Sequence, residues 1–420
     1  MVNAITFIMT ESCNMRCKYC FEQDYHYKNN YIDLKIIEKT LNMLFEQKLE
    51  KYEITLFGGE PTLNKEGILK VIDFLQDKSK EEIVIVMTTN LFKLDKELFN
   101  KLNELAKKEN ITIDIGVSAI LNEKYHDEDR IDINGKGTYK QIINNFKYCL
   151  THFENINFSV HSVISKKNIK HITEIIDSSL EFKLQNPRVY KNSFALVSVS
   201  SLNNIEEEYT KEELKYYYED YIKRDKEKYG ICKHYIEDIY FPIIYSFDLL
   251  YNRELHICRA MKTELTVGTD GNITPCHRAE LNVKQNNVKK ISYGNIKDVN
   301  SIEEIENKIP FIENIQDGKV KFISELTGED CTKCTFNNMC HSCIIATYNL
   351  TGSFKYKSKG ECLRTMTMAE LTMEYERIKT MKEIRNELEN INNRLNSLGE
   401  ITTINTEALV ELLKQKENNK

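Results

Sequence analysis

The sequence contains no tryptophan and only five prolines among its 420 residues, and neither shortage indicates a function. It has no apolar run of the roughly 20 residues that a membrane-spanning helix requires. The first residues precede a predicted strand and do not resemble a signal peptide. Basic residues are not in excess, because the chain has 58 Lys and Arg residues and 64 Asp and Glu residues. We therefore expect a cytoplasmic protein that binds neither a membrane nor, through bulk charge, a nucleic acid.

Cysteine, by contrast, is abundant, with 12 residues in the chain. In a cytoplasmic protein such cysteines are more often metal ligands than disulfide partners. The length allows two or three domains with a sizeable core. The hydrophobic fraction of 41% and the charged fraction of 29% are ordinary for a globular protein.

Short β-branched runs alternate with longer amphipathic runs from residue 4 to about 200. Strands are predicted over 4–9, 52–57, 83–88, 111–117, 156–164 and 193–199, and helices over 33–48, 65–77, 94–108, 138–152 and 168–182. This alternation is typical of a parallel sheet with right-handed crossovers. The predicted fold class is therefore α/β, with a partial (β/α)6 TIM-like barrel whose chemistry lies at the carboxyl ends of the strands.

The rest of the chain has a different composition. We expect four regions, namely the partial barrel over 1–204, a tyrosine-rich helical bridge over 205–256, a small cysteine-rich domain over 257–363 and a C-terminal helical extension over 364–420. The cysteine-rich region has little long periodicity, so it is expected to owe its fold to bound metal. In the extension, helices are predicted over 364–396 and 404–416.

Cys13, Cys17 and Cys20 follow the first predicted strand with the spacing Cys-x3-Cys-x2-Cys. Four thiolates close a zinc or iron–sulfur site, so three leave one position open for a cofactor. Tyr19 adds an aromatic face beside that opening. A structural zinc site with its fourth ligand elsewhere is the alternative interpretation.

Gly58-Gly59-Glu60-Pro61 follows the second predicted strand. The two glycines let the backbone come close to a ligand, and Glu60 can hydrogen-bond an amine. Taken alone, the segment is equally compatible with an ordinary glycine turn. Because it lies at the carboxyl end of the strand beside the cysteine loop, we expect the two segments to form walls of one pocket.

The pairing of these two motifs closely resembles the radical S-adenosylmethionine (radical SAM) enzymes. The resemblance implies that Cys13, Cys17 and Cys20 hold a [4Fe–4S] cluster whose fourth iron binds S-adenosylmethionine. Reductive cleavage of that cofactor, with electrons from a flavodoxin or ferredoxin, then gives a 5′-deoxyadenosyl radical that takes a hydrogen atom from the substrate. The protein is expected to position the cofactor and to exclude water.

The resemblance extends to further strand ends. Asn90 ends the third strand where the family often has Thr-Asn-Gly, with Leu91 in place of the glycine. Of the family pattern after the fourth strand only Ser118 is present, and Arg130 is a candidate partner for the cofactor carboxylate. A surface arginine beside acidic neighbours is the alternative for Arg130. The implied cofactor-binding residues are Tyr19, Gly58, Gly59, Glu60, Pro61, Asn90, Ser118 and Arg130.

Seven cysteines between 257 and 362 are too many for one cluster or one zinc ion. They resemble the SPASM extension of peptide- and protein-modifying radical SAM enzymes, which holds two auxiliary clusters and implies three [4Fe–4S] clusters in all. By this resemblance the outer cluster is held by Cys331, Cys334, Cys340 and Cys362, and the inner one by Cys258, Cys276 and Cys343.

Two departures from the SPASM pattern bear on the inner cluster. Only two residues separate Cys340 from Cys343, where three are usual, and no cysteine follows Cys258 closely. The inner cluster therefore either keeps an open iron or takes Cys232 as a ligand. Cys149 is expected to be a small buried hydrophobe in a helix.

His277 follows Cys276 at a position where formylglycine-generating relatives have an aspartate that accepts a proton. A neutral histidine can also accept a proton near pH 7, although a turn residue bonded to a cluster sulfur is the alternative.

The leading hypothesis is an oxidoreductase that installs a cross-link, such as a thioether or cyclophane, in a ribosomally made precursor peptide. The alternatives are an anaerobic sulfatase-maturating enzyme and a multi-zinc scaffold without catalysis. Since twelve residues precede Cys13, any leader peptide is expected to bind elsewhere, over 214–251 or 364–396.

Overall fold

The protein is described here from a computed structural model. The structure describes residues 1–20, 22, 28–197, 209–217, 219, 263–281, 290–307, 323–324, 327–334, 343, 345, 348–349, 352–353, 355–357, 359–397 and 414. The chain divides into two compact units, residues 1–369 and 370–420.

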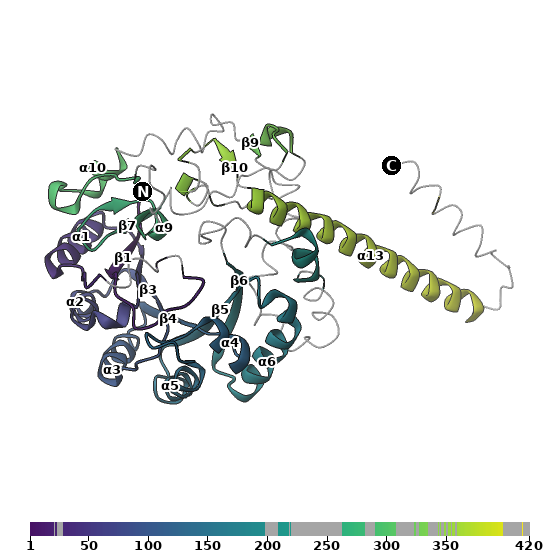
Figure 1. Ribbon diagram of the computed structural model, residues 1–420, viewed down its shortest axis with the longest axis horizontal. Coiled ribbons are helices and arrows are strands. Elements are labelled where there is room, and N and C mark those ends of the chain that lie inside the picture. The colour runs from purple at the N-terminus through teal and green to yellow at the C-terminus, as the bar shows by residue number, and fades with distance from the viewer. Residues whose placement is uncertain are drawn as a thin grey trace. The chain divides into compact units, whose positions relative to one another are not determined.

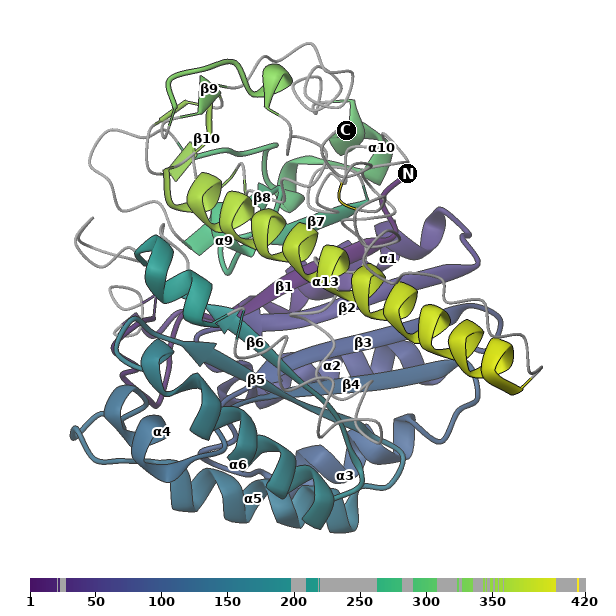
Figure 2. The ribbon, with the colours of Figure 1, turned by 90° about the vertical axis from the view of Figure 1, so that its right-hand side faces the viewer.

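Six parallel strands form the centre of the first unit (Figures 1 and 2). They are β1 (Ala4–Thr10), β2 (Lys51–Gly58), β3 (Glu82–Thr89), β4 (Ile111–Ser118), β5 (Asn157–Ile164) and β6 (Val189–Leu196). Their order in the sheet follows the chain, β6-β5-β4-β3-β2-β1, which confirms the predicted partial barrel. The last strand begins four residues before the predicted start at residue 193, because Val189 already pairs with Phe158 of β5.

Helices connect these strands and lie along the outer side of the curved sheet (Figure 1). They are α1 (Leu34–Glu46), α2 (Lys65–Gln76), α3 (Lys96–Leu105), α4 (Glu123–Asp129), α5 (Tyr139–His152) and α6 (Ile172–Gln185). The first three begin at side chains that cap the helix, since Asp33, Asn64 and Asp95 each accept a backbone N–H of the first turn. The short helix α4 was not predicted.

Residues of β2, β3 and β5 alternate between fully buried and half-buried positions. In β2 the buried side chains include Ile54 and Leu56, whereas Thr55 and Phe57 are half-buried. One face of the sheet is therefore packed under helices, and the other face forms the partly open interior of the barrel. The strand β1 is buried along its whole length.

The cysteine-rich region adds two strands to this sheet, which the sequence analysis did not predict. The strand β7 (Glu264–Val267) pairs in parallel with β1, and β8 (Ile273–Thr274) pairs antiparallel with β7. Further elements are α9 (His277–Leu281), α10 (Ile302–Glu306) and the 3-10 turns η6 (Ile296–Asp298) and η7 (Cys331–Lys333). The strands β9 (Ile323–Ser324) and β10 (Tyr356–Lys357) form a separate parallel pair.

The predicted helix over 364–396 is part of α13 (Lys359–Ser397), which starts five residues earlier. The predicted helix over 404–416 lies outside the described residues except for Lys414, and so does most of the predicted bridge over 205–256. Within the described residues no helix combines the length and apolarity needed to cross a membrane.

Candidate functional site

The three cysteines of the first motif lie in the loop after β1, at the carboxyl edge of the sheet. The backbone amide of Cys20 donates to the Cys17 carbonyl at 3.1 Å, which closes a turn. The Arg16 guanidinium donates to the carbonyl oxygens of Cys13 and Met15, at 2.7 Å each. The loop therefore presents its thiols from a backbone that is fixed by its own hydrogen bonds.

Burial controls the protonation of these thiols. It raises the pKa of Cys13 to about 12, with a further contribution from the Glu60 carboxylate. Burial likewise raises the pKa of Cys17, and it raises the pKa of Cys20 well above its usual range. Thiols of this kind stay protonated at neutral pH until a metal cation replaces the proton. Binding of a metal at these sulfurs would therefore release their protons.

Two buried nitrogen atoms beside the loop have no hydrogen-bond partner among the described residues, namely Asn14 Nδ2 and Arg130 Nε. Buried donors of this kind indicate an acceptor that the protein chain does not supply. Soft thiol ligands together with unpaired donors fit an iron–sulfur cluster and an anionic cofactor group. Within the described part of the chain, no group of three or more His, Cys, Asp or Glu side chains is arranged so that it could hold one metal ion.

The glycine turn packs directly against the stem of the cysteine loop. The Gly59 amide donates to the Thr10 carbonyl at 2.9 Å, and the Glu60 amide donates to the Ser12 carbonyl at 2.8 Å. A Cβ atom would lie 2.3 Å from the Thr10 oxygen at Gly58 and 2.3 Å from the Ser12 oxygen at Gly59. The glycines are therefore required by contact between two backbone segments, a reason that the sequence analysis did not identify.

Glu60 is only 1% exposed, and its side chain joins the ends of β2 and β3. Its carboxylate accepts hydrogen bonds from the hydroxyls of Thr62 and Thr89 and from the Asn90 amide, each at 2.7 Å. Burial raises the pKa of this carboxyl, and these hydrogen bonds oppose the rise. Glu60 therefore links the glycine turn to the end of β3, while Pro61 begins the 3-10 turn η1 (Pro61–Leu63).

Leu91 adopts a backbone conformation that favours glycine, the residue that the Thr-Asn-Gly pattern has at this position. Its φ of 54° lies in the left-handed region. This conformation costs a leucine residue roughly 1–2 kcal/mol. Burial of its side chain and a 3.0 Å hydrogen bond from its amide to the Thr89 hydroxyl hold it in place.

The segment after α4 covers the other side of the cysteine loop. The Arg16 amide donates to the Ile131 carbonyl at 2.7 Å, and the Lys18 amide donates to the Asp129 carbonyl at 2.9 Å. Arg130 is 5% exposed and donates to the Tyr19 hydroxyl at 2.7 Å. Arg130 is thus a buried residue that contacts the cysteine loop through Tyr19, and the alternative of a surface arginine is wrong.

The predicted cofactor residue Ser118 closes β4 and pairs in register with His161 of β5. It lies at the same edge of the sheet as the cysteine loop, the glycine turn and Asn90. All the predicted cofactor residues are therefore described and lie along this edge.

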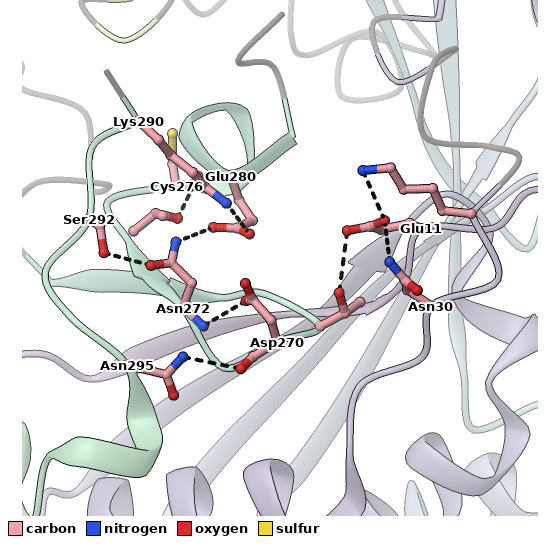
Figure 3. Close-up of polar contacts among 12 residues, drawn as sticks. Glu11, Asn30, Asp270, Asn272, Cys276, Glu280, Lys290, Ser292 and Asn295 are labelled. Atoms are coloured by element: carbon pink, nitrogen blue, oxygen red, sulfur yellow. Dashed lines mark hydrogen bonds and ion pairs between the residues drawn. The ribbon is translucent and has the colours of Figure 1, made fainter. Parts of the chain in front are cut away.

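A polar network surrounds the turn between β7 and β8 (Figure 3). The buried Glu280 accepts from Lys290 at 2.6 Å and from Asn272 at 2.9 Å. Across the same turn, the Thr269 hydroxyl donates to Glu11 at 3.3 Å. The network connects the segment before Cys276 with the residues that precede the cysteine loop.

His277, the predicted proton acceptor, begins α9. Its ring lies against the Phe57 ring of β2, with centroids 4.5 Å apart. Burial and the neighbouring Arg278 lower the pKa of this imidazole to about 3. The ring is therefore neutral at pH 7 and a weak proton acceptor.

Four of the predicted auxiliary ligands besides Cys276 are described. Cys331 begins the 3-10 turn η7 and Cys334 follows its last residue, and the Cys334 amide donates to the Cys331 carbonyl at 3.1 Å. The Cys362 thiol receives a 3.4 Å contact from the Ser324 hydroxyl of β9. Cys343 is half-buried. The remaining candidates Cys258, Cys340 and Cys232 lie outside the described residues.

Cys149 is fully buried in α5, as predicted for a small hydrophobe. Asn14, Phe57 and His161 also lie at this edge and were not predicted from the sequence. His161 alone carried a recognisable signal, since it is the one histidine within a predicted strand.

Comparison with known proteins identifies two regions of the chain. A model of the radical SAM superfamily matches residues 7–178, and a model of the SPASM iron–sulfur cluster-binding domain matches residues 258–343. The radical SAM cyclopropyl synthase TigE of Paramaledivibacter caminithermalis is 21% identical over 391 residues, which are 86% of this chain and 72% of that protein.

A cysteine-type anaerobic sulfatase-maturating enzyme of Clostridium novyi is 27% identical over 175 residues, 40% of this chain and 44% of that enzyme. Among solved structures, anSMEcpe with bound AdoMet aligns with a TM-score of 0.68 at 16% identity, over 91% of this chain and 95% of that one. Streptococcus suis SuiB bound to its precursor peptide SuiA aligns with a TM-score of 0.58 at 20% identity, over 86% and 76%. These structures share the fold of this chain.

Proposed function

The chain is a radical SAM enzyme with a SPASM iron–sulfur domain, and we propose that it installs a cross-link in a ribosomally made precursor peptide. The observation that carries the proposal is the similarity to TigE, a cyclopropyl synthase, over 86% of this chain. The shared fold with SuiB, which was solved with its precursor peptide, supports a peptide substrate.

In this proposal Cys13, Cys17 and Cys20 hold the cluster that binds S-adenosylmethionine. When bound, the cluster and the cofactor supply a 5′-deoxyadenosyl radical that removes a hydrogen atom from the substrate. Asn90, whose side chain lies 3.7 Å from the Cys13 sulfur, fixes the loop that holds the ligands. Arg130 offers its unpaired Nε to the cofactor carboxylate.

The auxiliary ligands follow the SPASM pattern. We assign Cys331, Cys334, Cys340 and Cys362 to the outer cluster and Cys258, Cys276 and Cys343 to the inner one, which gives three clusters in the chain. A flavodoxin or ferredoxin in the cytoplasm supplies the electrons. The low pKa of His277 favours a packing role against Phe57 over proton transfer.

A sulfatase-maturating activity is the second candidate, because a sulfatase-maturating enzyme matches 40% of this chain and anSMEcpe shares its fold. The histidine that follows Cys276, in place of the aspartate expected in such enzymes, disfavours it.

The test uses the full chain, reconstituted anaerobically with iron and sulfide and supplied with a strong reductant. One reaction contains short peptides encoded beside its gene, and another contains a sulfatase-derived peptide with the target cysteine. A loss of two hydrogen masses from an encoded peptide, with a new link located by tandem mass spectrometry, supports the proposal. Formylglycine in the sulfatase peptide alone supports the second candidate and overturns the first.

A further inference from the structure

Asp129, the last residue of α4, is a buried acid to which the proposed function assigns no role. It is 2% exposed, and its Oδ2 accepts hydrogen bonds from the Ser165 hydroxyl at 2.7 Å and from the Asn168 side-chain amide at 2.9 Å. Ser165 directly follows β5, and Asn168 precedes the 3-10 turn η2 (Ile169–His171) that leads into α6. The carboxylate thus ties the end of α4 to the loop that connects β5 with α6.

The backbone around Asp129 is bound to the cysteine loop. The Asp129 carbonyl accepts from the Lys18 amide at 2.9 Å, and the Ile131 carbonyl accepts from the Arg16 amide at 2.7 Å. Both donors lie between the first and the last cysteine of the first motif. The segment that includes residues 129–131 is therefore held by its backbone on one side and by the Asp129 carboxylate on the other.

Arg130 lies in this doubly held segment. Its guanidinium donates to the Tyr19 hydroxyl at 2.7 Å, and its carbonyl accepts from the Thr138 hydroxyl at 2.8 Å. Its Nε has no hydrogen-bond partner among the described residues. The neighbouring Asp129 carboxylate accepts from the β5–α6 loop and leaves this donor for a ligand.

An aspartate costs stability at this position. Removal of a carboxylate from water is unfavourable, and two neutral donors replace only part of its hydration. An acidic side chain at the C-terminal end of a helix also lies near the helix carbonyl groups, which carry partial negative charge. Residues that break such local rules are expected at functional sites. The position of Asp129 therefore indicates a role beyond stability.

We propose that Asp129 is a positioning residue for S-adenosylmethionine. By anchoring the end of α4 to the β5–α6 loop, it holds Arg130 Nε in position to donate to the carboxylate of the cofactor. The inference rests on the proposed function, in which Arg130 binds that carboxylate. Asp129 makes no contact with the cofactor in this proposal and acts through Arg130.

The first test measures the Kd of S-adenosylmethionine for the cluster-loaded chain in the absence of any peptide. Asp129→Ala is expected to weaken binding about tenfold, the equivalent of one lost hydrogen bond. Its iron content is expected to equal that of the wild type, because the backbone bonds to the cysteine loop remain. In Asp129→Asn the amide oxygen can still accept from Ser165 and Asn168, so the Kd is expected to stay within about twofold of the wild-type value.

Two further variants control for a loss of stability. Asn103→Ala removes a buried acceptor beside the amino end of β5, where Asn103 Oδ1 accepts from the Asn155 amide at 3.0 Å. It is expected to keep the wild-type Kd, and equal Kd values for Asn103→Ala and Asp129→Ala would overturn the proposal. Ser165→Ala removes one of the two donors to Asp129 and is the milder variant, expected to weaken binding about two- to threefold. A wild-type Kd in Ser165→Ala would also overturn the proposal.

A double-mutant cycle tests whether Asp129 acts through Arg130. In the Arg130→Gln background, Asp129→Ala is expected to change the Kd by less than about twofold, because the group that it positions is gone. An undiminished effect in that background would overturn the proposal. These measurements contain no peptide. A failure to modify any peptide would therefore overturn the proposed function, while the Kd values decide the role of Asp129.

Discussion

The backbone amide of Asn90 donates a 2.7 Å hydrogen bond to the Glu60 carboxylate and so joins the ends of β3 and β2. The Asn90 side chain continues the connection, since its amide donates to Asn14 at 2.8 Å and lies 3.7 Å from the Cys13 sulfur. A continuous chain of hydrogen bonds thus runs from the glycine turn to the first cysteine. Substitutions of Glu60 are therefore expected to disturb the position of the predicted metal ligand Cys13.

The variant Glu60→Gln tests this connection. An amide adds donor hydrogens where Thr62, Thr89 and Asn90 already donate, so we expect the free energy of unfolding to fall by about 1–3 kcal/mol. Release of 5′-deoxyadenosine is expected to fall about tenfold or more. Urea denaturation and chromatography of the released nucleoside measure the two effects. Glu97→Gln is the control, because Glu97 lies on the surface beside Lys65. Equal effects of both variants would contradict the role of Glu60.

Cys17→Ala is expected to remove the cluster of the first motif and to abolish S-adenosylmethionine cleavage. Iron analysis after reconstitution should find about four fewer iron atoms per chain than in the wild type, since a cube cluster holds four. Cys149→Ala is the matched control, because Cys149 is a buried cysteine of α5 that is not among the predicted ligands. An unchanged iron content in Cys17→Ala would show that this cysteine is not a ligand.

Much of the fold could be predicted from the sequence, because the alternation of β-branched and amphipathic runs specifies a parallel sheet. The position of the site followed from two short motifs at the ends of neighbouring parallel strands. The strand β7 could not be predicted in the same way. Its four residues carry no periodic signal, and it is stabilised by pairing with β1, some 260 residues earlier in the chain.

Other features depend on three-dimensional packing that no local pattern encodes. The helix α4 is short and almost entirely polar, so it lacks the apolar spacing of a predicted helix. The position of the His161 ring depends on Gly116 and Ser193, which lie on two other strands. The contact of Gly59 with Ser12 likewise joins segments that are 47 positions apart.

Gly59→Ala tests that contact. A Cβ atom 2.3 Å from the Ser12 carbonyl oxygen forces the glycine turn and the cysteine loop apart. We expect a loss of about 1–3 kcal/mol in the free energy of unfolding, together with reduced iron incorporation. In the control Gly135→Ala the new Cβ meets nothing within 4 Å, although the φ of 77° makes alanine strained there. That variant is expected to lose about 1 kcal/mol but to keep its iron content. Normal iron content in Gly59→Ala would contradict the proposed clash.

His126 gives a prediction about pH. It is fully buried, its Nδ1 accepts the Ile120 amide at 3.2 Å, and its Nε2 lies 3.1 Å from the Thr138 hydroxyl. Burial, and then the charge of Arg130, lower its pKa well below the usual 6.5. The folded protein therefore keeps this histidine neutral, whereas the unfolded chain binds a proton as the pH falls below 6.5.

The contribution of neutral His126 to the free energy of unfolding is complete above pH 6.5. It is lost as the pH falls, at about 1.4 kcal/mol per pH unit. The variant His126→Gln should be less stable at pH 7, because it loses buried hydrogen bonds. Its free energy of unfolding should, however, fall less steeply than that of the wild type between pH 6.5 and 5. Urea denaturation at several pH values measures both slopes. Parallel slopes would mean that His126 takes up its proton in the folded protein as readily as in the unfolded chain.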